Sequence, residues 1–177
     1  PTWPTPSAFS ILPTFLGFVG RGLCDGVAVG NVFTSPSSDA IVKAAKATHS
    51  GKGVLFLFGN YAGDTMNFEM AADELEMDGI HSEIVKVSDD VASATREKWN
   101  ERRGVAGLFF AYKVAGAAAA KGASLEEVST ITRKVIEKTA TMGVAFSSCQ
   151  LPAANKPIFS IGEDEMEIGM GIHGELG

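Results

Sequence analysis

The chain has 177 residues, 45% of them apolar, and a formal net charge of −6, which predicts one soluble globular domain with a substantial core. The acidic charge argues against nucleic acid or an anionic membrane as a partner, and no apolar run approaches the roughly 20 residues that span a bilayer. Cys24 and Cys149 lie in no metal-ligand pattern, so we expect reduced thiols and a cytoplasmic protein.

The N-terminal part of the chain gives few signals of regular structure. Residues 1–11 contain three prolines and no charge, so we expect an irregular N-terminal segment followed by one domain over residues 12–177. Ser38 can cap a helix that runs to Thr48 and stops at Gly51.

The middle of the chain predicts a strand, a helix and a second strand. Residues 54–58 are a continuous apolar run bounded by glycines, as expected of an interior strand of a parallel sheet that is buried on both faces. Asp64 or Thr65 then starts a helix that ends at Gly79, and residues 83–87 form the next strand.

The second half continues the alternation. Residues 107–121 are alanine-rich and predict a buried helix, and Ser124 with Glu127 forms a capping box for the helix that follows. Short strands are expected at 144–146, 157–159 and 166–168. Alternating strands and helices predict an α/β fold with a mostly parallel sheet flanked by helices.

The loop after the buried strand is the first candidate site. Ligands of open α/β sheets bind beyond the carboxyl ends of the strands, and Gly59 and Gly63 would let a ligand approach the backbone closely. Asp64 would lie near a helix N-terminus, where the dipole favours its ionised form. The alternative is that Asp64 is only a helix N-cap.

His173 is the second candidate, between glycines in residues 169–174. Its imidazole can act as a base, a metal ligand or a nucleophile, and the alternative is a surface histidine. The segment matches GxGxxG, but no helix follows and no acid lies about 20 residues on, so we expect no nucleotide site here. The three scattered histidines also argue against a zinc site.

Two charged pairs leave alternatives open. Arg102 and Arg103 could bind a phosphate, although a solvated or salt-bridged turn is the more common role of such a pair. Asp89 and Asp90 could bind a metal, although an acid pair at a helix start is favoured.

Several ordered segments together resemble the ketose-binding domain of the dihydroxyacetone kinases, over residues 12–177. The matching segments are residues 17–20, 32–36, 60–64 with 67–68, 102–104, 113–116, 143–149 and 171–175. Gly59, where dihydroxyacetone-specific members usually have lysine, and residues 12–15 are closer to the erythrulose and tetrose kinase-like branch.

The resemblance implies a glycerone kinase-like phosphotransferase. His173 would bond covalently to the carbonyl of a short ketose such as dihydroxyacetone or erythrulose, and Asp64 would accept the proton of the hydroxyl to be phosphorylated. Gly59, Asn60 and Gly63 would shape the pocket. The phosphoryl donor would be ATP or ADP with Mg²⁺, or a phosphotransferase-system relay, on a separate domain or subunit. This chain would bind no cofactor or metal of its own, and a homodimer is possible.

Two departures from the family pattern qualify these expectations. Ile11 stands where the family has the histidine of a Gly-Ser-Gly-His segment, and the chain stops soon after His173, where the family continues. We therefore expect a domain that is incomplete at its C-terminus. The alternatives are a non-enzymatic ketose sensor or regulator, or an inactive fragment of the same family.

Overall fold

The computed structural model describes residues 5–8, 14–31, 34–151 and 154–175. Its central sheet has three parallel strands in the order β1 (Thr5–Ala8), β2 (Val54–Gly59) and β3 (Ser82–Val87). Every residue of β2 is buried, and Leu55 and Phe56 are 0% exposed. The prediction of an interior strand in a parallel sheet is therefore confirmed.

Strand β1 corrects the expectation that residues 1–11 are irregular. Thr5–Ala8 pairs in parallel with residues 54–57 of β2. Proline cannot donate a ladder hydrogen bond and is confined to edge strands or strand starts. Pro6 is tolerated because β1 pairs only with β2 in the described sheet. Ile11 lies outside the described residues.

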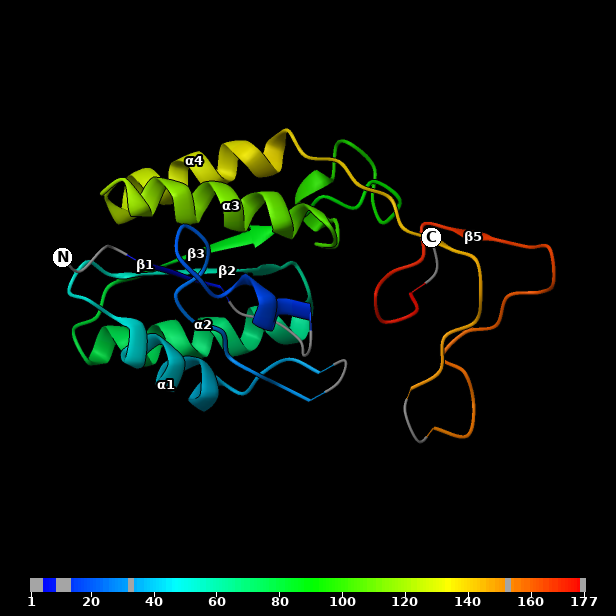
Figure 1. Ribbon diagram of the computed structural model, residues 1–177, viewed down its shortest axis with the longest axis horizontal. Helices are drawn as coiled ribbons and strands as arrows, with labels where there is room; N and C mark the ends of the chain where they lie inside the picture. Colours follow the sequence, from blue (N-terminus) through cyan, green and yellow to red (C-terminus); the bar gives the residue numbers. More distant parts are fainter. Residues whose placement is uncertain (1–4, 9–13, 32–33, 152–153, 176–177) are drawn as a thin grey trace.

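Helices cover both faces of the sheet (Figure 1). The helices α1 (Ser38–Thr48) and α2 (Ala62–Met77) lie on one face, and α3 (Gly107–Ala120) and α4 (Leu125–Glu137) lie on the other. Alternate residues of β2 divide between two cores, with Leu57 facing the α3 side and Phe58 stacking on Phe68 of α2 at 4.1 Å. The fold class is thus the α/β architecture that the sequence predicts.

Local capping signals were largely predictive. Ser124 and Glu127 form both hydrogen bonds of the capping box at the start of α4. Helix α1 is capped by Ser37 rather than Ser38, since the Ser37 side chain accepts from the Ala40 N–H. The error of one residue reflects a run of serines in which either hydroxyl could serve.

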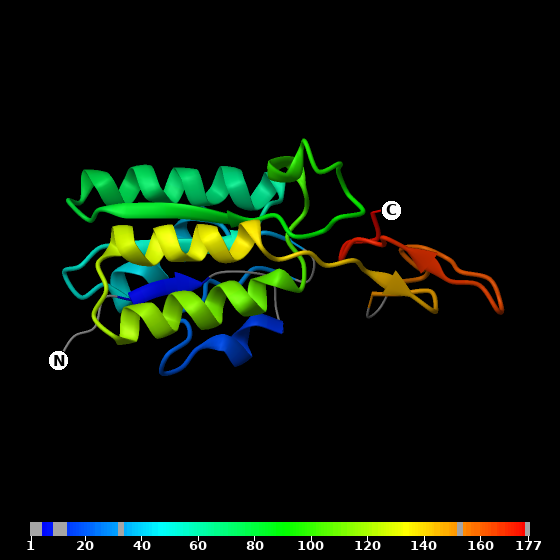
Figure 2. The ribbon, with the colours of Figure 1, turned by 90° about the horizontal axis from the view of Figure 1, so that it is seen from above.

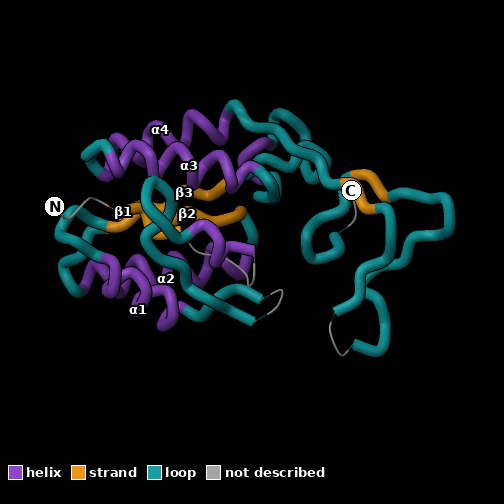
Figure 3. Tube along the Cα trace, in the orientation of Figure 1, coloured by secondary structure: helices purple, strands orange, loops and turns teal. Residues whose placement is uncertain are grey.

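The described residues after α4, 138–151 and 154–175, form an arm that projects beyond the layered body (Figure 2). The arm is mostly loop (Figure 3), held by the antiparallel pair β4 (Val144–Ala145) and β5 (Glu167–Ile168). The strand expected at 157–159 is only an isolated bridge between Cys149 and Phe159. Two short 3₁₀ helices, η1 (Thr14–Phe18) and η2 (Trp99–Glu101), complete the described structure. Among the described helices, none is long and apolar enough to cross a membrane.

Candidate functional site

Asp64 lies in the first turn of α2, immediately beyond the carboxyl end of β2. The helix begins at Ala62, and its N-cap residue Tyr61 makes no side-chain capping bond. Asp64 is therefore not the N-cap, and that alternative is wrong. Its side chain is only 2% exposed, and within the described part of the chain its Oδ1 has no hydrogen-bond partner.

The environment of Asp64 disfavours its charge. Burial raises the pKa of this carboxyl, and a hydrogen bond from Ser35 and the charge of His173 offset part of the rise. A carboxylate with a raised pKa and an unpaired oxygen is a suitable proton acceptor for a ligand hydroxyl.

Gly59 and Gly63 are positions where backbone or side-chain atoms approach closely. A Cβ at Gly59 would lie 3.0 Å from the Gly104 carbonyl oxygen, and one at Gly63 would lie 2.8 Å from the Ser35 hydroxyl. Gly63 therefore lets Ser35 approach the first turn of α2, where it contacts Asp64.

Asn60 anchors a neighbouring loop. Its Nδ2 donates hydrogen bonds to the carbonyl oxygens of Asn100 at 3.1 Å and Arg102 at 2.9 Å. Its backbone N–H continues the ladder by donating to the Val87 carbonyl at 2.9 Å. The structure thus gives Asn60 a positioning contact that the sequence did not predict.

His173 lies in a tight loop that closes on itself. The Gly171 N–H donates to the Glu175 carbonyl at 2.8 Å, and Gly174 has a φ of +88°, a backbone conformation that favours glycine. His173 Nδ1 is 3.0 Å from Oε1 of Glu175, whose Oε2 accepts from the His173 backbone N–H at 3.0 Å.

Glu175 remains ionised in this loop. Burial opposes the charge, but backbone N–H groups at residues 173 and 175 and the His173 imidazole outweigh it and lower the pKa of Glu175. A carboxylate bound to Nδ1 fixes the imidazole tautomer and its orientation. A histidine held in this way by a carboxylate can serve as a base or a nucleophile.

Tyr61 joins the two candidate segments. Its ring meets the His173 ring edge to face, with centroids 4.8 Å apart and planes at 87°. Tyr61 is the N-cap residue of α2, whose first turn carries Asp64, so this contact holds the arm against the carboxyl edge of the sheet. Burial, followed by the negative charge of Glu175, raises the pKa of Tyr61, which keeps the phenol protonated.

Arg103 forms a buried ion pair within the body and also ties the arm to it through a hydrogen bond. Arg103 Nε and Nη2 each lie 3.0 Å from Oδ2 of Asp90, and Nη2 also donates to the Gly169 carbonyl at 2.9 Å. The Arg103 side chain is 13% exposed and that of Asp90 is 0% exposed. Of the two alternatives for the arginine pair, Arg103 therefore takes the salt-bridged one.

Asp89 caps α3 from a distant position in the sequence. Its carboxylate accepts the N–H groups of Val105 at 2.9 Å and Gly107 at 2.8 Å, and also bonds the Thr141 hydroxyl. No helix begins at Asp89 and Asp90, so the favoured role of an acid pair at a helix start is wrong, and Asp89 instead accepts from N–H groups at the distant start of α3. Among the described residues no group of His, Cys, Asp and Glu is arranged to hold a metal ion.

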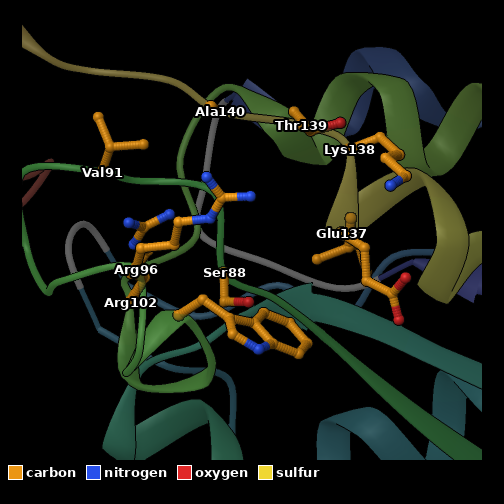
Figure 4. Close-up of a pocket in the computed structure, with 10 residues that line it drawn as sticks. Ser88, Val91, Arg96, Arg102, Glu137, Lys138, Thr139 and Ala140 are labelled. Atoms are coloured by element: carbon orange, nitrogen blue, oxygen red, sulfur yellow. The ribbon is translucent and has the colours of Figure 1, made fainter.

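A separate cavity of about 580 Å³ lies between the loop after β3 and the end of α4 (Figure 4). Arg96, Arg102 and Lys138 line it together with Glu137 and Trp99. It contains none of the five residues expected in ketose binding and catalysis, although Arg102, one of the two arginines considered for phosphate binding, lines it. Its charges are of both signs, and the C-terminal dipole of α4 opposes an anion there.

Comparisons with known proteins agree with this architecture. The family model described as the Dak1 domain matches residues 11–177, and the chain belongs to the Dak1 domain family. It is 48% identical over 165 residues to the D-erythrulose kinase of Mycolicibacterium smegmatis, covering 93% of this chain and 28% of that protein. It is 51% identical over 165 residues to a Listeria innocua protein, PTS-dependent dihydroxyacetone kinase 2, dihydroxyacetone-binding subunit DhaK, covering 93% of this chain and 49% of that one.

Solved structures show the same fold. The dihydroxyacetone kinase from C. freundii in complex with AMP-PNP and Mg²⁺ superposes with a TM-score of 0.86 at 33% identity, over 98% of this chain and 33% of that one. The dihydroxyacetone kinase operon co-activator Dha-DhaQ gives 0.86 at 31% identity, over 98% of this chain and 55% of that one. The chain thus spans between about a quarter and about half of the length of these relatives.

The family resemblance inferred from the sequence is confirmed, but sequence reasoning missed several residues around the site. Glu175 had a usable signal, an acid two positions after His173 in a glycine-rich loop. Tyr61 appeared only as a matching motif residue. Arg103 contacts Gly169 across 66 positions, and no local pattern in the sequence indicates that contact.

Proposed function

We propose that this chain is the ketose-binding part of a glycerone kinase-like phosphotransferase. The single observation that carries the proposal is the His173–Glu175 pair, whose imidazole packs on Tyr61 at the start of the helix that carries the buried Asp64. A histidine that donates from Nδ1 to a carboxylate has its lone pair at Nε2. Such a nitrogen can add to a carbonyl, while a buried carboxylate can accept a proton from a hydroxyl of the same molecule.

In the addition step, Glu175 takes part by removing a proton from the imidazole. The Nε2 lone pair forms a bond to the ketose carbonyl carbon, and the carbonyl π bond breaks toward oxygen. The Nδ1 proton leaves through Glu175, 3.0 Å away, to solvent, and the new alkoxide takes a proton from solvent, so Glu175 is ionised again at the end. The product is a neutral hemiaminal. Only a molecule with an electrophilic carbonyl carbon can form it, so short ketoses are selected over polyols.

Phosphorylation would then use Asp64. As the ketose hydroxyl attacks the phosphoryl group, its proton moves to Asp64, whose raised pKa favours proton uptake. The donor would be ATP or ADP with Mg²⁺ on a separate domain or subunit, or a phosphotransferase-system relay. A relative named as a dihydroxyacetone-binding subunit supports the division into separate units. Gly59, Asn60 and Gly63 would shape the pocket, and we keep a cytoplasmic homodimer as part of the proposal.

A regulatory role is the second candidate. The similar structure titled an operon co-activator supports it, and Ile11 in place of the family histidine fits a protein that binds ketose without turnover. Phosphoryl transfer to the ketose in the presence of a donor subunit would identify the enzyme. Adduct formation without transfer would identify the sensor.

The test is NMR with dihydroxyacetone labelled with ¹³C at the carbonyl. The expected result is a saturated-carbon resonance that appears with the parental chain, persists in Asp64→Asn and disappears in His173→Gln. His81→Gln is the matched control. His81 is an exposed histidine just before β3, at the edge of the sheet opposite the carboxyl ends of the strands. A resonance that survives in His173→Gln would refute the covalent role of His173.

A further inference from the structure

Tyr61 places an aromatic ring of the body against the imidazole of His173. It follows the carboxyl end of β2, which points toward the arm (Figure 1), and it is the N-cap residue of α2. Its ring is nearly perpendicular to the imidazole, with centroids 4.8 Å apart. Its hydroxyl is buried and has no hydrogen-bond partner in the described part of the chain. The ring, rather than the hydroxyl, is thus the part of Tyr61 that contacts this histidine.

Two contacts of different kinds restrain the imidazole. The carboxylate of Glu175 lies 3.0 Å from Nδ1, where it fixes the position of that nitrogen and the tautomer. A single hydrogen bond leaves the ring free to pivot about the line from Nδ1 to Oε1. A perpendicular aromatic neighbour restricts this pivot, because aromatic pairs favour edge-to-face over face-to-face geometry. Glu175 and Tyr61 together therefore define the direction in which Nε2 points.

Gly59 provides the space that the Tyr61 ring occupies. A Cβ at this position would lie 3.0 Å from Cε2 and 3.2 Å from Cδ2 of Tyr61, closer than an ordinary van der Waals contact. It would also lie 3.0 Å from the Gly104 carbonyl oxygen, which belongs to the backbone. A side chain at residue 59 would thus press on a backbone atom and on a ring, of which the ring moves more easily.

Resting on the proposed function, we propose that Tyr61 is a positioning residue, whose ring holds the His173 imidazole with Nε2 directed at the ketose carbonyl, and that Gly59 serves the same step by leaving room for that ring. Neither residue needs to touch the ketose. Alignment matters because a nucleophile must lie about 3–3.5 Å from the carbon that it attacks, with its lone pair aimed at it. An imidazole that pivots spends part of its time outside that geometry.

The test follows both the imidazole and the adduct. Relaxation of the ¹³C–¹H groups of the His173 ring measures how rigidly the ring is held in the free protein, and its signals are assigned from their absence in His173→Gln. Tyr61→Leu should lower the order of the imidazole. It should also weaken the adduct with carbonyl-labelled dihydroxyacetone by about 2- to 12-fold, the contribution of one aromatic pair. Tyr61→Phe keeps the ring and should match the parental chain in both measurements.

The tautomer of His173 separates positioning from a general loosening of the loop. Glu175 sets the tautomer, so the ring ¹⁵N shifts of Tyr61→Leu should still show the proton at Nδ1. A changed tautomer would mean that Tyr61 supports the whole loop rather than the imidazole, and would overturn the proposal. Parental ring order in Tyr61→Leu, or a loss of order in Tyr61→Phe as large as in Tyr61→Leu, would overturn it as well.

Gly59→Ala tests the second half of the proposal. Alone, it should lower the order of the imidazole and weaken the adduct. Combined with Tyr61→Leu, it should add little, because leucine has no atom at the place of Cε2. Gly20→Ala is the matched control, since a Cβ there meets nothing within 4 Å, and it should leave both readouts parental. Equal losses from Gly59→Ala with and without the Tyr61 ring would refute this role of Gly59.

The order of the imidazole is measured without any ketose. If dihydroxyacetone forms no adduct with the parental chain, the proposed function fails, and the ring order alone then decides whether Tyr61 and Gly59 position the imidazole.

Discussion

The strongest prediction concerns Arg103, which forms an ion pair with Asp90 inside the body and donates a hydrogen bond to the arm at Gly169. Arg103→Met keeps most of the aliphatic length of the side chain and removes its charge. Asp90 would then be an uncompensated charge in a fully buried position. Breaking a buried pair in this way typically costs roughly 3–5 kcal/mol.

The structure places the expected cost toward the lower end of that range. Asp90 would keep one partner, since its Oδ1 accepts the Ala92 N–H at 3.1 Å. The Gly169 carbonyl would lose the charged donor that Arg103 supplies at 2.9 Å. We therefore expect a loss of about 3 kcal/mol, a large share of the roughly 5–15 kcal/mol that stabilise a domain.

Urea unfolding followed by circular dichroism measures the loss in the free energy of unfolding, and amide hydrogen exchange measures the release of the arm. Exchange at Gly171 and His173 should accelerate, because their N–H groups donate within the loop at 2.8 and 3.0 Å. The control is Arg96→Met, an exposed arginine of the same loop, for which a change within about 0.5 kcal/mol is expected.

A double-mutant cycle with Asp90→Asn isolates the pairing term. Once Asp90 is neutral, Arg103→Met should cost at least about 2 kcal/mol less than it does alone. If Arg103→Met alone is no more destabilising than Arg96→Met, or if Gly171 and His173 exchange at the parental rate, then the ion pair does not hold the arm and the reasoning is refuted.

Three further predictions concern stability measured by urea unfolding. Asp25 is exposed, but partial desolvation raises its pKa to about 6, so a small contribution to stability is fully present below the unfolded value of about 4 and is lost as the pH rises through 6; Asp25→Asn should remove this small decline, and a parental pH dependence in the variant would contradict the assignment. A Cβ at Gly116 would collide with the Leu23 carbonyl oxygen, so Gly116→Ala should lose about 1–3 kcal/mol despite the better helix propensity of alanine; a gain in stability would show that the helix can shift. Ser124→Ala removes the cap that accepts from the Glu127 N–H at 3.2 Å and should lose about 1 kcal/mol, whereas Ser124→Asp should keep most of it; equal losses in both variants would argue against capping.

The parts of the fold that the sequence predicted have local causes. The apolar run of β2 is buried on both faces because helices cover both sides of the sheet. The capping box runs over the four residues from Ser124 to Glu127 and needs no tertiary partner. Such signals can be interpreted within a window shorter than one helix.

The elements that the sequence missed depend on distant partners. Thr5–Ala8 has no apolar run and contains Pro6, and it becomes a strand because β2 supplies its backbone partners. Helix α3 has Ala106 at its N-cap with no side-chain capping bond. Its first N–H groups are instead satisfied by Asp89, which lies 16 to 18 positions earlier. A pattern limited to neighbouring residues cannot detect either arrangement.

The candidate site also combines local signals, which the sequence reveals, with contacts between distant residues, which it does not. Glycine-bounded loops containing an acid and a histidine can be recognised in the sequence, because the residue types themselves indicate chemistry. The relative position of Asp64 and His173, by contrast, is set by the elements that carry them. Asp64 is fixed by the sheet and α2, while His173 is fixed by the arm.

Two contacts connect the arm, which carries His173, to the body of the protein, which carries Asp64. Tyr61 meets the His173 ring at 4.8 Å, and Arg103 binds the arm four residues before that histidine, at Gly169. In the proposed function, a hydroxyl and a carbonyl of one small ketose must reach Asp64 and His173 together, and these two contacts hold the arm in place for that. Misplacement by about 1 Å can cost a hundredfold in rate. Substitutions that loosen the arm should therefore affect the chemistry of this site even where they touch neither Asp64 nor His173.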